Sequence, residues 1–218
     1  MSEKIIEVIN VTKTFGSQKA LNQVSVTFGS GKIYGIIGRN GSGKTVLFKC
    51  ICGFLKITQG KIIINGKEIS KKCEIPSNIG IIIETPGFLP NLSGYRNLKL
   101  LSLVSGTFDK SRIAEVMKMV DLDVKSKKHV SKYSLGMRQR LGIAQAILEN
   151  PDILILDEPM NGLDAQGVED MRKLFIKMRE EGKTILLASH NAEDIAFLCD
   201  AVYRLDDGVM EYVEREGV

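Results

Sequence analysis

The sequence has no tryptophan and little cysteine or histidine: its 218 residues include four cysteines and two histidines. The cysteines (Cys50, Cys52, Cys73 and Cys199) show none of the paired spacings that are typical of a zinc site. Cys50 and Cys52 are two positions apart on a predicted helix, so their side chains diverge and cannot hold one ion. We therefore expect reduced thiols in the core, as in a cytosolic protein.

Long apolar runs are also missing. No stretch of about 18 uninterrupted apolar residues occurs, so no segment is expected to insert directly into a membrane. The first residues, MSEKIIEVINV, lack the apolar segment of a signal peptide. A membrane role would therefore have to come through another chain.

The excess of one charge is small, since 30 lysines and arginines against 26 acidic residues give a net charge of +4. This charge suits an anionic ligand. The lysines are scattered along the chain rather than gathered in blocks, which is typical of a solvated surface. No nucleic acid is expected as a partner.

What the sequence does contain is a regular alternation of strand and helix patterns, with 44% hydrophobic residues. Residues 5–11 and 24–28 are rich in β-formers on either side of a turn, which predicts an antiparallel pair. Residues 61–67 predict a strand that enters a hairpin at Asn65-Gly66. Residues 79–83 form a near-continuous apolar run, which predicts a strand buried on both faces.

The second half of the chain predicts a parallel sheet. Buried strands are predicted at residues 153–157 and 184–188, a last strand at 201–205, and helices at 165–181 and 191–199. Strands that alternate with helices form a parallel sheet, so the fold class is α/β, with a mostly parallel core sheet and an antiparallel β sub-lobe.

Residues 93–148 have a helical pattern instead. Ser93 and Asp109 can cap two of the predicted helices, and a third helix is predicted from Tyr133 to Leu148. We interpret this segment as an α-helical sub-lobe inserted into a single domain over residues 1–218, whose nucleotide-binding core consists of residues 1–92 and 149–218.

The motif around which the chain is organised is a glycine-rich loop, GRNGSGKT, that fits G-x-x-x-x-G-K-[ST] at every fixed position. The glycines let several backbone N–H groups face one anion, and the following helix adds the positive end of its dipole. A glycine-rich turn with a stray lysine is the alternative, but it does not explain the strand–loop–helix context. We expect Lys44 to reach the nucleotide phosphates and Thr45 to ligate Mg²⁺. The residues predicted to bind nucleotide are Gly38, Arg39, Asn40, Gly41, Ser42, Gly43, Lys44, Thr45 and Val46.

Three further candidates follow strands of the predicted sheet. Parallel sheets bind ligands at the carboxyl ends of their strands, where Asp157, Glu158 and His190 all fall. Asp157 is a candidate Mg²⁺ ligand, Glu158 a candidate base for the attacking water, and His190 a candidate donor to the γ-phosphate. A solvated turn and a surface histidine are the alternatives, and the phosphate loop weighs against both.

These motifs together resemble the ATP-binding cassette of ABC transporters over nearly the whole chain. Residues 133–140, YSLGMRQR, look like the signature whose usual form is Leu-Ser-Gly-Gly-Gln followed by Gln-Gln-Arg. Residues 161–164, NGLD, resemble the D-loop, and His190 the switch histidine. No guanine-reading Asn-Lys-x-Asp motif occurs, which disfavours a GTPase.

The resemblance implies a P-loop ABC ATPase fold and roles for further residues. Phe15 falls where the family places an aromatic ring that stacks on adenine. Ser134 and Gly136 would reach the γ-phosphate held by a second copy, and Asp164 of the D-loop would lie at the same nucleotide. This implies a head-to-tail homodimer with ATP in its interface.

The chain departs from the usual family pattern at three positions. Leu135 replaces the first glycine of the signature and Met137 its glutamine, and Glu84 stands where the family has the Q-loop glutamine. A carboxylate at position 84 can still ligate Mg²⁺. At these positions the chain resembles the cassettes of bacitracin-resistance and lantibiotic-immunity exporters.

The resemblance implies an ATP-hydrolysing subunit that powers a separate transmembrane permease from the inner, cytoplasmic face of the membrane, exporting an antimicrobial peptide or drug. Residues 86–103, broken by proline and glycine, are expected to touch the permease. One alternative is a soluble ABC ATPase acting in DNA repair or translation, and another is a nucleotide sensor that does not hydrolyse ATP.

Overall fold

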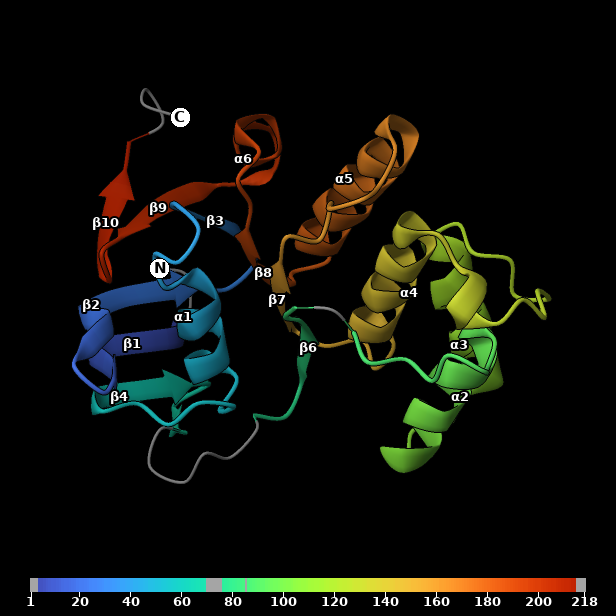
Figure 1. Ribbon diagram of the computed structural model, residues 1–218, viewed down its shortest axis with the longest axis horizontal. Coiled ribbons are helices and arrows are strands. Elements are labelled where there is room, and N and C mark those ends of the chain that lie inside the picture. Colours follow the sequence, from blue (N-terminus) through green and yellow to red (C-terminus); the bar gives the residue numbers. More distant parts are fainter. Residues whose placement is uncertain (1–3, 70–75, 85, 215–218) are drawn as a thin grey trace.

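The structure is a computed structural model that describes residues 4–69, 76–84 and 86–214 (Figure 1). Its centre is a six-stranded sheet in the order β10-β9-β3-β8-β7-β6. The strands of this sheet are β3 (Ile33–Ile37), β6 (Ile79–Ile82), β7 (Ile153–Asp157), β8 (Thr184–Ala188), β9 (Ala201–Asp206) and β10 (Val209–Val213). All neighbours pair in parallel except β9 and β10. The predicted α/β class is confirmed.

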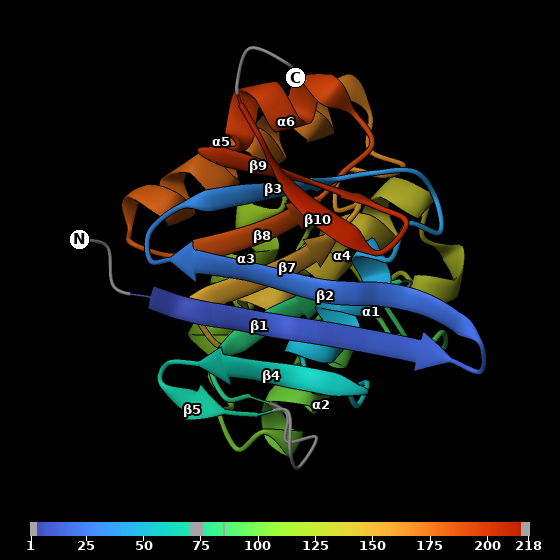
Figure 2. The same ribbon diagram turned by 90° about the vertical axis from the view of Figure 1, so that its left-hand side faces the viewer.

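A four-stranded antiparallel sheet lies beside it, in the order β2-β1-β4-β5 (Figure 2). Its strands are β1 (Lys4–Phe15), β2 (Gln18–Gly29), β4 (Gln59–Ile64) and β5 (Lys67–Glu68). The predicted antiparallel pair and the predicted hairpin at Asn65-Gly66 are both confirmed. Both residues of that turn have positive φ angles (49° and 76°), as an Asn-Gly hairpin requires.

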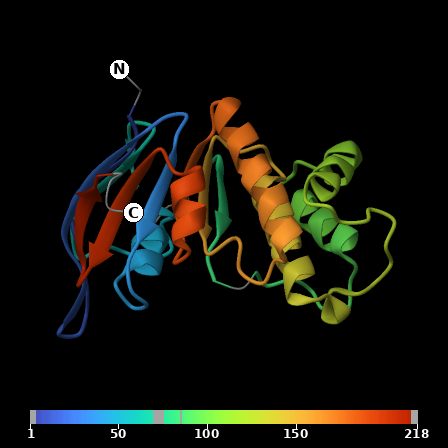
Figure 3. The same ribbon diagram turned by 90° about the horizontal axis from the view of Figure 1, so that it is seen from above.

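The helices fall into two groups. Helix α1 (Lys44–Ile51) lies between the two sheets. The others are α2 (Gly94–Val104), α3 (Lys110–Met119), α4 (Leu135–Ile147), α5 (Ala165–Glu180) and α6 (Ala192–Leu198). Of these, α4, α5 and α6 lie on the opposite face of the six-stranded sheet, and α2 and α3 pack beyond α4 (Figure 3). The Ser93 and Asp109 side chains accept hydrogen bonds from backbone N–H groups of α2 and α3, as the sequence predicts. None of the helices in the described part of the chain has the length and apolar character needed to cross a bilayer.

The six-stranded sheet separates two hydrophobic cores. Ile153 and Ile155 of β7 face α1 and the antiparallel sheet, whereas Leu154 and Leu156 face the other helices, and all four are fully buried. Successive side chains of a strand point to opposite faces, so a strand covered on both faces needs an unbroken apolar run. This explains the runs in β7 and β8.

Two strand predictions are wrong. The strand at 79–83 is not buried on both faces: it is the edge strand β6, and Ile79 and Ile81 are only half-buried because the outer side of an edge strand is incompletely covered. The strand at 201–205 is not the last one, since β10 follows it. An Asp207-Gly208 turn, with φ angles of 44° and 76°, returns the chain antiparallel to β9.

The thiols agree with the prediction where they are described. Cys50, Cys52 and Cys199 are buried, and burial raises the pKa of Cys52 to about 12. Cys73 lies outside the described residues.

Candidate nucleotide-binding and hydrolytic site

The phosphate loop joins β3 to α1, as the motif predicts. Gly43 is the residue before α1 and has a φ of 110°, a conformation that L side chains rarely adopt. A Cβ on Gly43 would lie 2.4 Å from the Ala20 carbonyl oxygen of β2. The glycine is therefore required by the close approach of the antiparallel sheet to the loop.

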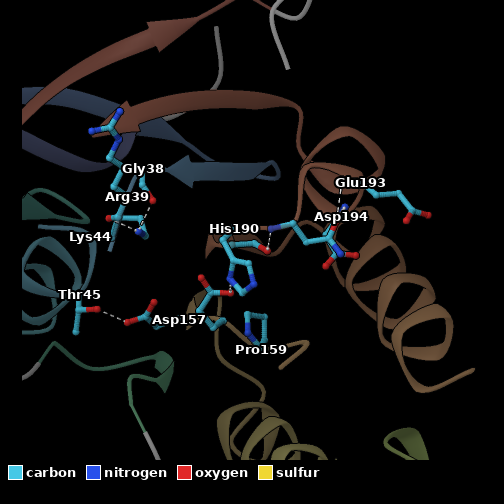
Figure 4. Close-up of polar contacts among 12 residues, drawn as sticks. Gly38, Arg39, Lys44, Thr45, Asp157, Pro159, His190, Glu193 and Asp194 are labelled. Atoms are coloured by element: carbon cyan, nitrogen blue, oxygen red, sulfur yellow. Dashed lines mark hydrogen bonds and ion pairs between the residues drawn. The ribbon is translucent and has the colours of Figure 1, made fainter. Parts of the chain in front are cut away.

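Lys44 is buried within this loop. Its Nζ donates hydrogen bonds to the carbonyl oxygens of Gly38 (2.7 Å) and Arg39 (3.0 Å), so the ammonium group lies inside the curl of the loop (Figure 4). A lysine in this place adds a fixed positive charge where phosphates would bind.

Ser42 gives a test of whether the loop fits an anion. Its Oγ is buried and has no hydrogen-bond partner among the described residues. Buried polar atoms are normally satisfied, and a phosphate oxygen within the loop would accept a hydrogen bond from the Ser42 hydroxyl. The loop therefore fits a nucleotide phosphate.

The strand and the loop meet where Thr45 contacts Asp157. The Thr45 Oγ1 donates a hydrogen bond of 2.6 Å to Asp157 Oδ2 (Figure 4), although 112 residues separate them in the chain. Burial raises the pKa of Asp157 above its ordinary value, and the negative charge of Glu158 adds to this, while the Thr45 hydrogen bond opposes it. A divalent cation would favour the ionised carboxylate, so this pair suits Mg²⁺, which is held by few protein oxygens and keeps several waters.

No cluster of three or more His, Cys, Asp or Glu side chains able to hold a metal occurs in the described part of the chain. Glu84, the third predicted metal ligand, lines the same cavity as Asp157 but forms an ion pair with Lys49. Its contact with Lys49 would have to open or be shared for Glu84 to reach a cation.

Glu158 and His190 lie together at the ends of β7 and β8. The Nδ1 atom of His190 lies 2.9 Å from Glu158 Oε2. An ionised carboxylate can only accept, so Nδ1 is the donor, and a neutral ring then offers Nε2 as an acceptor. To donate to a phosphate through Nε2, the His190 ring must be protonated on both nitrogens or release Glu158.

One cavity of about 520 Å³ collects most of these groups. It is lined by Asn40, Gly41, Gly43, Lys44, Thr45, Val46, Glu84, Pro86, Leu135, Arg138, Gln139, Asp157, Glu158 and Asn161. A second cavity of about 300 Å³ lies beside it, where His190 and Arg39 are among the lining residues. The structure thus brings the predicted loop, strand ends and histidine to one edge of the sheet.

Helix α4 contributes a residue that the sequence reasoning missed. Gln139 Nε2 donates to the carbonyl oxygens of Glu158 (3.2 Å) and Pro159 (2.9 Å), which ties the helix to the segment that carries the candidate base. Gln139 lies four positions after Leu135, on the same face of a helix, and both line the cavity. That spacing was the available signal.

The other signature and D-loop residues are placed by capping. Ser134 is the N-cap of α4, where its Oγ accepts from Met137 N (3.1 Å), and Asp164 is the N-cap of α5, where it accepts from Gly167 N. Ser134 is exposed and does not line the 520 Å³ cavity. A Cβ on Gly136 would lie 2.8 Å from the Gly162 carbonyl oxygen, so the signature and the D-loop are in direct contact.

Phe15 lies at the end of β1 with 48% of its surface exposed, and Lys13 Nζ lies 4.7 Å from its ring centroid. The β1–β2 hairpin that carries it packs on the phosphate loop through Ala20. Phe15 lines neither of the two cavities, and its exposed ring leaves room for the predicted stacking on adenine.

Known proteins resemble this chain closely. Residues 21–161 match the family described as ABC transporter. The chain is 43% identical to the bacitracin transport ATP-binding protein BcrA of Bacillus licheniformis, over 94% of this chain and 67% of that protein. It is 37% identical to the lantibiotic transport ATP-binding protein SrtF of Streptococcus pyogenes, over 94% and 88% respectively.

A solved structure shares the fold. The ATP-binding cassette MJ0796, described as dimeric and bound to ADP and Pi after hydrolysis, superposes with a TM-score of 0.85 at 25% identity, covering 96% of this chain and 99% of that one. The predicted resemblance to ABC cassettes, and to those of bacitracin and lantibiotic exporters, is confirmed. Together with the phosphate loop, the strand ends and the signature described above, these matches show that the chain belongs to the ABC transporter family as an ATP-binding and ATP-hydrolysing cassette.

Proposed function

We propose that this cassette hydrolyses Mg²⁺–ATP to drive a separate transmembrane permease on the inner face of the membrane. The observation that carries the hydrolytic part is the meeting of Thr45 with Asp157 and of His190 with Glu158 at one sheet edge. Three separate segments of the chain supply these groups, and chance contact would not align them with a phosphate loop.

In this proposal each residue has a separate task. Lys44 and the loop N–H groups hold the phosphates, and Glu158 orients the attacking water and takes its proton. Thr45 and Asp157 would hold Mg²⁺, which neutralises charge on the phosphate oxygens. His190 would contact the γ-phosphate and so respond to its presence.

We further propose that two copies close head to tail around ATP. Ser134 is exposed at the amino end of α4, where the backbone N–H groups and the helix dipole favour an anion from outside its own chain. The cassette MJ0796 is described as dimeric, which supports the same arrangement here. Because neither copy alone completes the site, ATP binding favours closure and hydrolysis favours release.

The permease would dock in a groove of about 850 Å³ between β6 and helices α2 and α4. Exposed apolar side chains line it, notably Phe54, Leu101 and Val104, the last 88% exposed. The sequence analysis predicted permease contact through residues 86–103, of which Pro86, Gly87 and Leu101 line the groove, and Phe54 and Val104 line it from outside that range. Phe88 also lies within residues 86–103, but it packs against the core. A substitution there would lower the stability of the chain as well as any binding to the permease.

Val104→Asp should therefore reduce co-purification with the permease about tenfold, because a charge at an apolar contact of this kind costs roughly 1–2 kcal/mol. Phosphate release by the isolated chain should not change, since Val104 lies outside the nucleotide cavity. Val209→Asp, at an exposed apolar position on β10, is the matched control and should co-purify normally. Equal co-purification of both variants with the permease would mean that the permease docks on another surface.

The cargo we propose is an antimicrobial peptide or drug, because the relatives BcrA and SrtF are named for bacitracin and lantibiotic transport. We also propose that residues 93–148 form a helical sub-lobe within a single domain over residues 1–218. The soluble DNA-repair or translation ATPase is disfavoured by these relatives.

Co-purification from native membranes in mild detergent tests the transporter proposal. Recovery of a polytopic membrane protein in equal amount is the expected result, together with steady-state phosphate release from ATP. Recovery only with ribosomes, DNA or nothing would contradict a permease partner. Binding of ATP without phosphate release would instead indicate a nucleotide sensor.

A further inference from the structure

His190 lies next to a helix that is too short to be stable without contacts to the rest of the protein. Helix α6 has seven residues, and isolated helices shorter than about 12 residues are marginal in water. Asn191 caps it by accepting from Glu193 N (2.8 Å) and Asp194 N (3.3 Å), so His190 directly precedes the cap. The place of His190 therefore depends on β8, which ends at Ala188, and on whatever fixes the first turn of α6.

Arg172 of α5 fixes that turn. Its Nε and Nη2 donate to Asp194 Oδ1 at 2.9 and 2.6 Å, and its Nη1 donates to Glu193 Oε1 at 3.1 Å. The side chains of Arg172 and Asp194 are 9% and 2% exposed, and the guanidinium lies 5.2 Å from the Phe197 ring centroid. Figure 4 shows Glu193 and Asp194 on the helix that begins just after His190.

The other anchors of α6 are apolar or lie at its far end, although Ile195 lines the same cavity as His190. Ile195 and Leu198 pack into the core under β3. Arg179, also on α5, pairs with Asp200 at 3.2 Å beyond the far end of α6, where the Asp200 carboxylate also accepts from Ile33 N. Arg172 is thus the polar link to the end of α6 that follows the histidine.

We propose that Arg172 is a positioning residue for ATP hydrolysis, which holds the first turn of α6 and so keeps His190 against Glu158. A buried ion pair is weak evidence for stability, because desolvation offsets much of its attraction, but two hydrogen bonds from a planar guanidinium to one carboxylate fix orientation. Arg172 does not line either nucleotide cavity, so it acts through His190. This inference rests on the role proposed above for His190.

The two histidines make a direct test possible in the nucleotide-free full chain. With ¹⁵N-histidine labelling at a pH of about 8, long-range ¹H–¹⁵N spectra report which ring nitrogen carries the proton. His190 should show a protonated Nδ1, because it donates to Glu158. His129, exposed on the loop before α4, is the internal reference.

Arg172→Lys keeps the charge but loses the planar pair of donors. We expect the ring ¹⁵N shifts of His190 to move toward those of His129, whose own shifts stay constant. Arg179→Lys, the same change on the same helix, should move neither histidine. Glu193→Gln removes only the ion pair between Arg172 and the exposed Glu193 carboxylate. It should therefore move the ring ¹⁵N shifts of His190 in the same direction by a smaller amount.

Kinetics supply the second readout. Arg172→Lys should lower kcat by about tenfold with little change in the KM for ATP, since displacements of about 1 Å in a positioned group can cost up to ~100-fold. Arg179→Lys should leave both parameters unchanged.

Unmoved His190 signals in folded Arg172→Lys would overturn the proposal. If that variant does not fold, unmoved signals in Glu193→Gln overturn it equally. Because the spectra are recorded without nucleotide or permease, they remain informative even if the transporter proposal fails.

Discussion

Glu158→Gln should bind ATP normally and hydrolyse it at least ~100-fold more slowly, because general-base catalysis of this kind contributes roughly 10²–10⁴-fold. The amide keeps the size of the side chain but cannot accept a proton from water. The backbone of Glu158 is held independently of its side chain, since its N–H donates to the Ala188 carbonyl oxygen at 2.9 Å. Phosphate release and equilibrium binding of a fluorescent ATP analogue measure the two effects separately.

The slowed variant should also accumulate as an ATP-bound dimer, which light scattering can detect. Glu181→Gln, an exposed carboxylate at the end of α5, is the control and should match the unmodified chain. Turnover within a few-fold of normal in Glu158→Gln would remove Glu158 as the catalytic base.

Gly43→Ala should abolish detectable ATP binding and lower the free energy of unfolding of the nucleotide-free chain by about 3 kcal/mol. The added Cβ would lie 2.4 Å from the Ala20 carbonyl oxygen and 3.3 Å from side-chain atoms of Leu21 and Leu205, at a backbone φ of 110°. The loop or strand β2 must therefore shift, and the shift separates the loop N–H groups from a phosphate. Urea denaturation and ATP titration are the two measurements.

Gly41→Ala is the matched control within the same loop. Its φ of 83° gives a similar backbone strain, but a Cβ there meets no atom within 4 Å. We expect a loss of only about 1 kcal/mol in the free energy of unfolding. Equal losses in both variants would mean that backbone strain, and not the contact with β2, requires glycine at position 43.

Much of the fold was predictable because its signals are local. The Asn65-Gly66 hairpin, the capping residues Ser93 and Asp109 and the apolar run of β7 each report on a few neighbouring residues. The hairpin turn at Asp207-Gly208 carries the same kind of local signal, so β10 was also predictable from the sequence, although the prediction ended at 201–205.

The place of a strand within its sheet was a different matter. β6 and β7 have similar apolar sequences, yet only β6 lies at an edge, and its half-buried residues follow from that place. Strand order depends on which segments pair across the whole chain. A periodicity within one segment does not contain that information.

The candidate site divides in the same way. The sequence alone determined the chemistry: the spacing of the phosphate loop, a carboxylate pair after a buried strand and a histidine after another specify an ATP-binding edge of a parallel sheet. Only the tertiary structure decided which groups touch: Thr45 with Asp157, Gln139 with the Glu158 backbone, and Arg172 with Asp194. The reason is physical, because a side-chain hydrogen bond requires its atoms within about 3 Å, and only the packing of sheets and helices brings together residues that lie 19 to 112 positions apart in the chain.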